Sequence, residues 1–221
     1  MNLIICEGSG EIAFLYAYLK KKGYTIKKEK DKLYEFAKSK KYLENEIVDK
    51  LSIINLNGNG NLEKIVDRLL KSPIEDIKQV KKIGFFVDAE SNFEDIKGRI
   101  LKIREKIIQE LSIEVHYYIS PYNNGYKGML EDLIIEISKD KILLTFIESK
   151  TFPELNEKVE EQKEKIKNHT KAKFMIYGAT QNPMNGVAHL FLTENETINK
   201  LDFESNKLEK FHTFMKNFDI I

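Results

Sequence analysis

Residues 3–11 read LIICEGSGE, so a short apolar run stands directly before an acidic turn that contains two glycines. An uninterrupted apolar run of this length is typical of a strand that is buried on both faces of a sheet. After the turn, Ile12, Leu15 and Leu19 recur at helical spacing. The segment therefore predicts a strand, a tight turn and a helix over 11–22 in succession.

The same alternation continues through the first 120 residues. Further strands are predicted at 51–56, 83–87 and 113–119, and further helices at 61–71 and 93–111. Residues 24–50 are rich in lysine and are interpreted as an insertion. Because strands alternate with helices, the pattern predicts an α/β fold with a mainly parallel sheet and helices on both of its faces.

The remainder of the chain has a mostly helical pattern. Helices are predicted at 128–137, at 153–167 and near the C-terminus, where Leu208, Phe211 and Phe218 share an apolar face. The stretch 174–192 fits either a helix or a strand. We expect residues 1–120 to form the α/β core, and residues 121–221 to form a mostly helical portion packed against it in one compact unit.

The composition is that of a globular protein, with 42% hydrophobic and 32% charged residues. No apolar run approaches the length of about 18 residues that a membrane span needs, so no membrane partner is expected. The single cysteine, Cys6, excludes an internal disulfide and a zinc site built from several cysteines. A cytoplasmic protein is the simplest expectation.

Charge is distributed unevenly along the chain, although the net charge is only +1. Residues 20–41 hold ten lysines and three acidic residues. Such a cluster is typical of a solvated surface segment, and a lysine cluster also holds a nucleic-acid backbone without sequence preference. Both interpretations remain open from the sequence.

Acidic residues directly follow two of the predicted strands. Glu7 follows the first strand, Asp88 follows the strand at 83–87, and Glu90 comes two residues later. Sites in parallel sheets lie outside the carboxyl ends of the strands, and a spacing of two in an extended segment points side chains the same way. We therefore expect the three carboxylates to group around Mg²⁺, which prefers oxygen ligands. Alternatively, Asp88 caps the following helix and Glu7 is a solvated loop acid.

These stretches resemble the motifs of the Toprim domain. Residues 3–11 resemble its opening strand and Glu-Gly turn, and residues 83–90, IGFFVDAE, resemble its later strand with an Asp-x-Asp motif. The resemblance implies the small parallel sheet, flanked by helices, of topoisomerases, bacterial primases and the overcoming-lysogenization-defect nucleases. It also implies that Glu7 performs acid/base chemistry and that Asp88 and Glu90 bind Mg²⁺. Glu90 stands where the family usually has a second aspartate.

A second resemblance covers later parts of the chain. Residues 121–133, PYNNGYKGMLEDL, and residues 171–214 are similar to the DUF3226 group of uncharacterised prokaryotic Toprim-like proteins. This similarity implies that Glu131 and Asp132 lie close to the metal site. Alternatively, they are acids in the first turn of a helix with an exposed face.

Other residues near these motifs are weaker candidates. Glu11 joins the metal site, as an acid at this position does in overcoming-lysogenization-defect nucleases, or it is a first-turn acid favoured by the helix dipole. Gly8 and Gly10 let a phosphate approach the start of the helix, or they simply form the turn. Lys127 and Lys171 would neutralise the charge of a phosphate. A lysine near any acid is common in a chain so rich in lysine.

The expected function is phosphodiester chemistry that depends on Mg²⁺ or Mn²⁺, of the kind that nucleases perform on DNA or RNA without sequence specificity. The alternative is a non-catalytic module that binds metal with nucleotide or nucleic acid, as a sensor or as a subunit of a defence system. Glu90 and the near-neutral net charge favour that alternative. A phosphotransferase or phosphatase that acts on a nucleotide is a third hypothesis. The sequence leaves open whether the chain forms a homo-oligomer.

Overall fold

The computed structural model describes residues 2–24, 51–56, 58–71, 80–90, 92–181, 192 and 195–219. The lysine-rich insertion expected at 24–50 falls outside these residues, apart from Tyr24. Most of the second half of the ambiguous stretch 174–192 falls outside them as well.

Among the described residues, four parallel strands form the sheet, in the order β2-β1-β3-β4. Their bounds are β1 Asn2–Cys6, β2 Leu51–Asn55, β3 Lys82–Asp88 and β4 Glu114–Ser120. Every residue of β1 is buried, as the apolar run at 3–6 predicts for a strand covered on both faces. The predicted α/β class with a mainly parallel sheet is confirmed. Each strand lies within two residues of its expected position.

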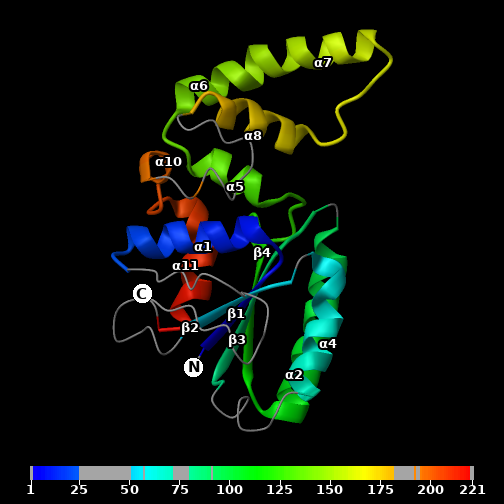
Figure 1. Cartoon of the computed structure of the whole chain (residues 1–221), viewed down its shortest axis with the longest axis vertical. Helices are drawn as coiled ribbons and strands as arrows, with labels where there is room; N and C mark the ends of the chain where they lie inside the picture. Colours follow the sequence, from blue (N-terminus) through cyan, green and yellow to red (C-terminus); the bar gives the residue numbers. More distant parts are fainter. Residues whose placement is uncertain are drawn as a thin grey trace.

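One face of the sheet is covered by α2 (Leu62–Lys71) and α4 (Phe93–Leu111), as Figure 1 shows. A short 3-10 turn, η2 (Asn59–Asn61), precedes α2. The helix predicted at 93–111 is confirmed at both ends, because an apolar stripe runs along its whole length and packs on the sheet. The Asn92 side chain accepts a hydrogen bond from the Asp95 N–H and begins this helix, while Ser112 ends it in the left-handed conformation.

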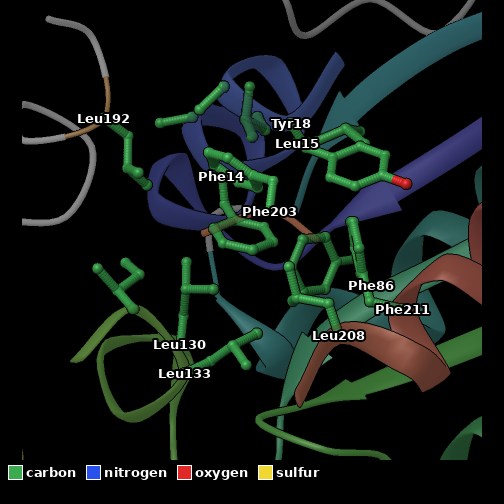
Figure 2. Close-up of a cluster of buried hydrophobic side chains, with 14 of the residues drawn as sticks. Phe14, Leu15, Tyr18, Phe86, Leu130, Leu133, Leu192, Phe203, Leu208 and Phe211 are labelled. Atoms are coloured by element: carbon green, nitrogen blue, oxygen red, sulfur yellow. The ribbon is translucent and has the colours of Figure 1, made fainter. Parts of the chain in front are cut away.

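The other face is covered by α1 (Ser9–Lys21) and α11 (Glu209–Lys216), which follows the 3-10 turn η4 (Asn206–Leu208). Aromatic rings fill the space between these helices and the sheet (Figure 2). The Phe211 ring lies 5.4 Å from the Phe86 ring and 5.3 Å from the Phe14 ring, measured between centroids. The C-terminal helix therefore belongs to the core, and its phenylalanines are packing residues.

The described residues between β4 and α11 are mostly helical, as expected. Its elements are α5 (Leu130–Ile137), α6 (Lys141–Phe146), the π-helical η3 (Ile147–Thr151), α7 (Phe152–Glu161), α8 (His169–Ala179) and α10 (Asn195–Asn199). The helices α6, α7 and α8 extend beyond α5, away from the sheet (Figure 1). The helix predicted at 153–167 ends at Glu161. Within the described ranges, no helix combines the length and apolar character that crossing a membrane requires.

Candidate acidic site at the sheet edge

A pocket of about 260 Å³ lies at the carboxyl edge of the sheet. Its walls come from the turn after β1, the start of α1, the turn after β2, the end of β3, the start of α5 and α8. The lining residues are Glu7, Gly8, Ser9, Gly10, Glu11, Gly58, Asp88, Leu130, Glu131 and Lys171. The structure therefore brings together candidate residues from the α/β core and from the helical portion in one pocket.

Glu7 and Asp88 lie side by side because β1 and β3 are adjacent in the sheet. The Glu7 N–H donates to the Phe86 carbonyl over 3.0 Å and continues the strand pairing by one residue. The Glu7 Oε2 atom then accepts from the Asp88 N–H over 3.0 Å. The Asp88 Oδ1 atom accepts from the Leu130 N–H over 2.9 Å, at the first residue of α5. Asp88 thus does not cap the helix that follows it in sequence, because Asn92 does so.

Glu11 caps the start of α1 and also lines the pocket. Its side chain turns back so that Oε2 accepts from the Gly8 N–H over 2.8 Å, which caps α1. It also lines the pocket, although only 5% of the residue is exposed. Burial, followed by the nearby charges of Glu7 and Glu131, raises the pKa of Glu11 to about 7.

The carboxylates in the pocket strongly influence one another. Burial raises the pKa of Asp88 well above its usual value, and repulsion from Glu11, Glu7 and Glu131 raises it further. The hydrogen bond from the Leu130 N–H acts in the opposite direction but is the weaker effect. The two buried acids of the pocket, Glu11 and Asp88, therefore keep their protons to higher pH than ordinary carboxyl groups do.

Two glycines, Gly8 and Gly58, line the pocket beside the acids. A Cβ atom on Gly8 would lie 3.3 Å from the Glu11 Oε2 atom, so the absent side chain leaves space for that carboxylate. Gly58, after β2, has φ +103° and donates from its N–H to the Glu7 carbonyl over 2.9 Å. Neither Gly58 nor Ser9 was among the site residues predicted from the sequence. The available signal was that Gly58 follows a strand at the same edge of the sheet.

Glu90 lies outside the pocket lining. The extended geometry that the two-residue spacing assumes stops after Ala89, which is fully buried. Glu90 is exposed, adopts φ +47°, and its carbonyl accepts from the Gly128 N–H over 3.0 Å. Its side chain is therefore not brought to the same pocket as Asp88.

The two acids at the start of α5 have different surroundings. Glu131 lines the pocket. Asp132 does not, because its Oδ2 atom accepts from the Met129 N–H over 2.9 Å and its Oδ1 atom accepts from the Thr170 hydroxyl over 2.8 Å. Lys171 lines the pocket from α8, whereas Lys127 is exposed and lies outside the lining.

In the part of the chain that the structure describes, no three His, Cys, Asp or Glu side chains are already arranged to hold a metal ion. The Glu7, Glu11 and Asp88 carboxylates each accept a backbone N–H with one oxygen. The site is thus a group of neighbouring carboxylates fixed by backbone hydrogen bonds, in which side chains must adjust if a cation binds.

Comparison with known proteins places the whole chain in one group. The family profile described as "Protein of unknown function (DUF3226)" matches residues 1–219. A crystal structure of a hypothetical protein from Pyrococcus horikoshii OT3 is similar, with a TM-score of 0.57, 16% sequence identity, and coverage of 98% of this chain and 92% of that one. At this identity the similarity concerns the fold alone. No curated protein matches the chain.

Proposed function

Because the chain belongs to the DUF3226 family, whose description assigns no activity, we propose a function from the acidic pocket itself. The proposed function is phosphodiester hydrolysis of DNA or RNA that depends on Mg²⁺ or Mn²⁺, on a fold related to the Toprim domain. The observation that supports it is the convergence of Glu7, Glu11, Asp88 and Glu131 on one pocket at the carboxyl edge of a parallel sheet.

The donor atoms of the pocket suit a hard divalent cation. All four acidic side chains offer carboxylate oxygens, and Mg²⁺ needs only two or three of these because it retains several waters. Burial and mutual repulsion raise the pKa of both Asp88 and Glu11, and a bound cation would relieve that repulsion. We assign the metal ligands to Asp88 and Glu131, with Glu11 as a third.

The chain's own residues would perform separate tasks around the phosphate. Mg²⁺ held in the pocket would polarise the phosphoryl group and lower the pKa of a bound water. Glu7, positioned by the Asp88 N–H, would take the proton of the nucleophile and return it to the leaving oxygen. The first turn of α1 presents backbone N–H groups beside Gly10 to the phosphate. Lys171 is the one cation among the described residues that line the pocket, and it would offset phosphate charge.

The proposal is tested by comparing Asp88→Asn with Glu90→Gln, which alters an acid close in sequence but outside the pocket. Mg²⁺ and Mn²⁺ are titrated while Tm is followed, and cleavage of single- and double-stranded DNA and RNA is measured. Binding to the folded state raises Tm, so wild type and Glu90→Gln should show a metal-dependent rise together with cleavage, and Asp88→Asn should show neither. Cleavage that persists unchanged in Asp88→Asn would refute the assignment.

One observation favours the non-catalytic alternative. Glu90, which occupies the second acidic position of the Asp-x-Asp motif, does not line the pocket. A module that binds metal and nucleic acid without cleaving it needs fewer precisely placed ligands than a hydrolase does. This alternative predicts the metal-dependent rise in Tm, and tighter oligonucleotide binding with metal, but no cleavage product from any of the four substrates.

A further inference from the structure

A second hollow, of about 510 Å³, lies beside a different face of α5 from the acidic pocket. Glu131 lines the pocket and Glu136 lines the hollow, and five residues on a helix turn by about 140°. The hollow lies between the segment that joins β4 to α5 and the start of the C-terminal helix. Its lining residues are Tyr122, Asn124, Tyr126, Glu136, Asn206, Lys207, Glu209 and Lys210. We call it the tyrosine hollow.

The two tyrosines offer ring surfaces of different character. Tyr126 is 67% exposed, although a large aromatic side chain in water forgoes the benefit of burial. Tyr122 is half-buried, and the Lys207 Nζ atom lies 6.0 Å from its ring centroid. The hollow thus has one half-buried ring and one exposed ring.

The charges around the hollow largely balance. The Lys207 Nζ atom lies 3.1 Å from the Glu136 Oε2 atom, and Lys210 accompanies Glu209 at the start of α11. A hollow with balanced charge does not concentrate anions. It suits a flat ligand with apolar faces and polar edges better than a free phosphate.

Polar groups for the edges of such a ligand are present. The Asn124 Oδ1 atom accepts from the Tyr126 N–H over 3.4 Å, which leaves the Asn124 amide N–H groups to donate. Asn206 adds a second amide to the lining. Aromatic rings with nearby amides and lysines are the means by which proteins bind unpaired bases, because every base has a face that stacks.

A short continuous stretch of chain, from Tyr126 to Leu130, runs from the hollow to the acidic pocket. Tyr126 lines the hollow and Leu130 lines the pocket, and four residues span at most about 14 Å even when extended. A strand of nucleic acid is therefore able to contact both places at once.

We propose that the tyrosine hollow holds an unpaired base of the nucleic-acid strand whose phosphodiester lies in the acidic pocket. This inference rests on the proposed function and specifies its substrate as single-stranded. A base within a duplex is paired and stacked, so its faces are not accessible to Tyr126. Stacking on Tyr126 also distinguishes a polymer from other phosphates that the acidic pocket alone would accept.

The test measures binding of short fluorescent oligonucleotides in the Glu7→Gln background with Mg²⁺ present, so that the substrate is not consumed. Tyr126→Ala removes the exposed ring, Tyr126→Phe retains it, and Phe146→Ala removes an exposed ring on α6 that does not line the hollow. We expect Tyr126→Ala to weaken binding of single strands about tenfold, at the low end of measured stacking contributions. Tyr126→Phe and Phe146→Ala should bind as the background protein does.

Three results would overturn the inference: equal binding by Tyr126→Ala and Phe146→Ala, an equal loss with duplex, or mononucleotides that compete as well as the oligonucleotide. The outcome is separable from that of the proposed function. If cleavage is lost in Asp88→Asn but unaffected in Tyr126→Ala, the proposed base site is wrong and the proposed hydrolysis stands. If Tyr126→Ala binds more weakly but the wild-type protein cleaves nothing, the base site stands and the proposed hydrolysis is wrong.

Discussion

At the scale of single residues, Glu11 illustrates how burial and charge act on the same group. It caps α1 through the Gly8 N–H, yet it is buried beside Glu7 and Glu131, so its pKa rises from 4.5 to about 7. A raised pKa means that the folded state binds the proton more tightly than the unfolded chain does. The free energy of unfolding therefore falls as pH rises from about 4.5 through about 7.

We expect Glu11→Gln to raise the Tm of the metal-free protein at pH 8 and to leave it nearly unchanged at pH 5. At pH 8 the variant removes a buried negative charge but keeps an oxygen that accepts from the Gly8 N–H. At pH 5 wild-type Glu11 is already protonated, so the two proteins are alike. Thermal unfolding in the presence of a chelator measures the difference, with exposed Glu90→Gln as control. A gain of equal size at both pH values would contradict the assigned cause.

Single residues also show where prediction from sequence succeeds. Glu7 and Asp88 were predictable, because a strand ends at a defined edge and the next side chain lies there. The position of the Glu90 side chain was not predictable, because a spacing of two residues does not reveal that the backbone at Glu90 adopts φ +47°. Glu131 and Asp132 are both acids in the first turn of α5, but Asp132 accepts hydrogen bonds from the Met129 N–H and from the Thr170 hydroxyl, whereas Glu131 lines the pocket. The contact with Thr170, on α8, could not be predicted from the sequence pattern.

At the scale of elements, the contact between β3 and the C-terminal helix depends on a glycine. Gly84 stands in the middle of β3, and a Cβ atom placed there would lie 2.5 Å from the Phe218 ring and 2.9 Å from the Phe214 ring. The phenylalanines therefore approach the strand more closely than any side chain at this position permits.

Gly84→Ala is expected to lower the free energy of unfolding by about 1–3 kcal/mol, the usual cost of overpacking a core. Gly98→Ala is the matched control, since a Cβ atom there has no neighbour within 4 Å and alanine favours a helix interior over glycine by about 0.5–1 kcal/mol. Urea denaturation of the two variants should shift in opposite directions. A stable Gly84→Ala protein would show that the C-terminal helix moves away without cost.

Elements were predictable to the extent that they bury an apolar stripe. The helix at 93–111 does so along its length, and both of its ends were predicted. By contrast, α6 was not predicted, and none of its six residues is buried, so no stripe distinguishes it. The helix predicted at 153–167 was too long, since after Glu161 the chain turns back toward α8 and the pattern gives no sign of this turn.

At the scale of the whole molecule, the helical portion completes both the core and the site. Phe211 of α11 lies 5.2 Å from Tyr118 and 5.0 Å from Tyr18 between ring centroids, so its ring joins the sheet to α1. The acidic pocket likewise takes Glu131 from α5 and Lys171 from α8. The expected boundary at residue 120 divides the sequence pattern, but contacts cross it at the core and at the pocket.

We therefore expect a chain that ends at residue 120 to lack cooperative unfolding, although it contains the four strands found in the described residues. Without α11 the rings of Phe14, Phe86 and Tyr118 lose the helix that covers them. Thermal unfolding followed by near-ultraviolet circular dichroism, and binding of a dye that detects exposed apolar surface, would measure the effect. In the full chain, Phe211→Ala should lower the free energy of unfolding by about 3–5 kcal/mol, because it removes the same ring contacts. If the shortened chain unfolds cooperatively with a native-like tyrosine signal, residues 1–120 are a separate domain and the packing of α11 is dispensable.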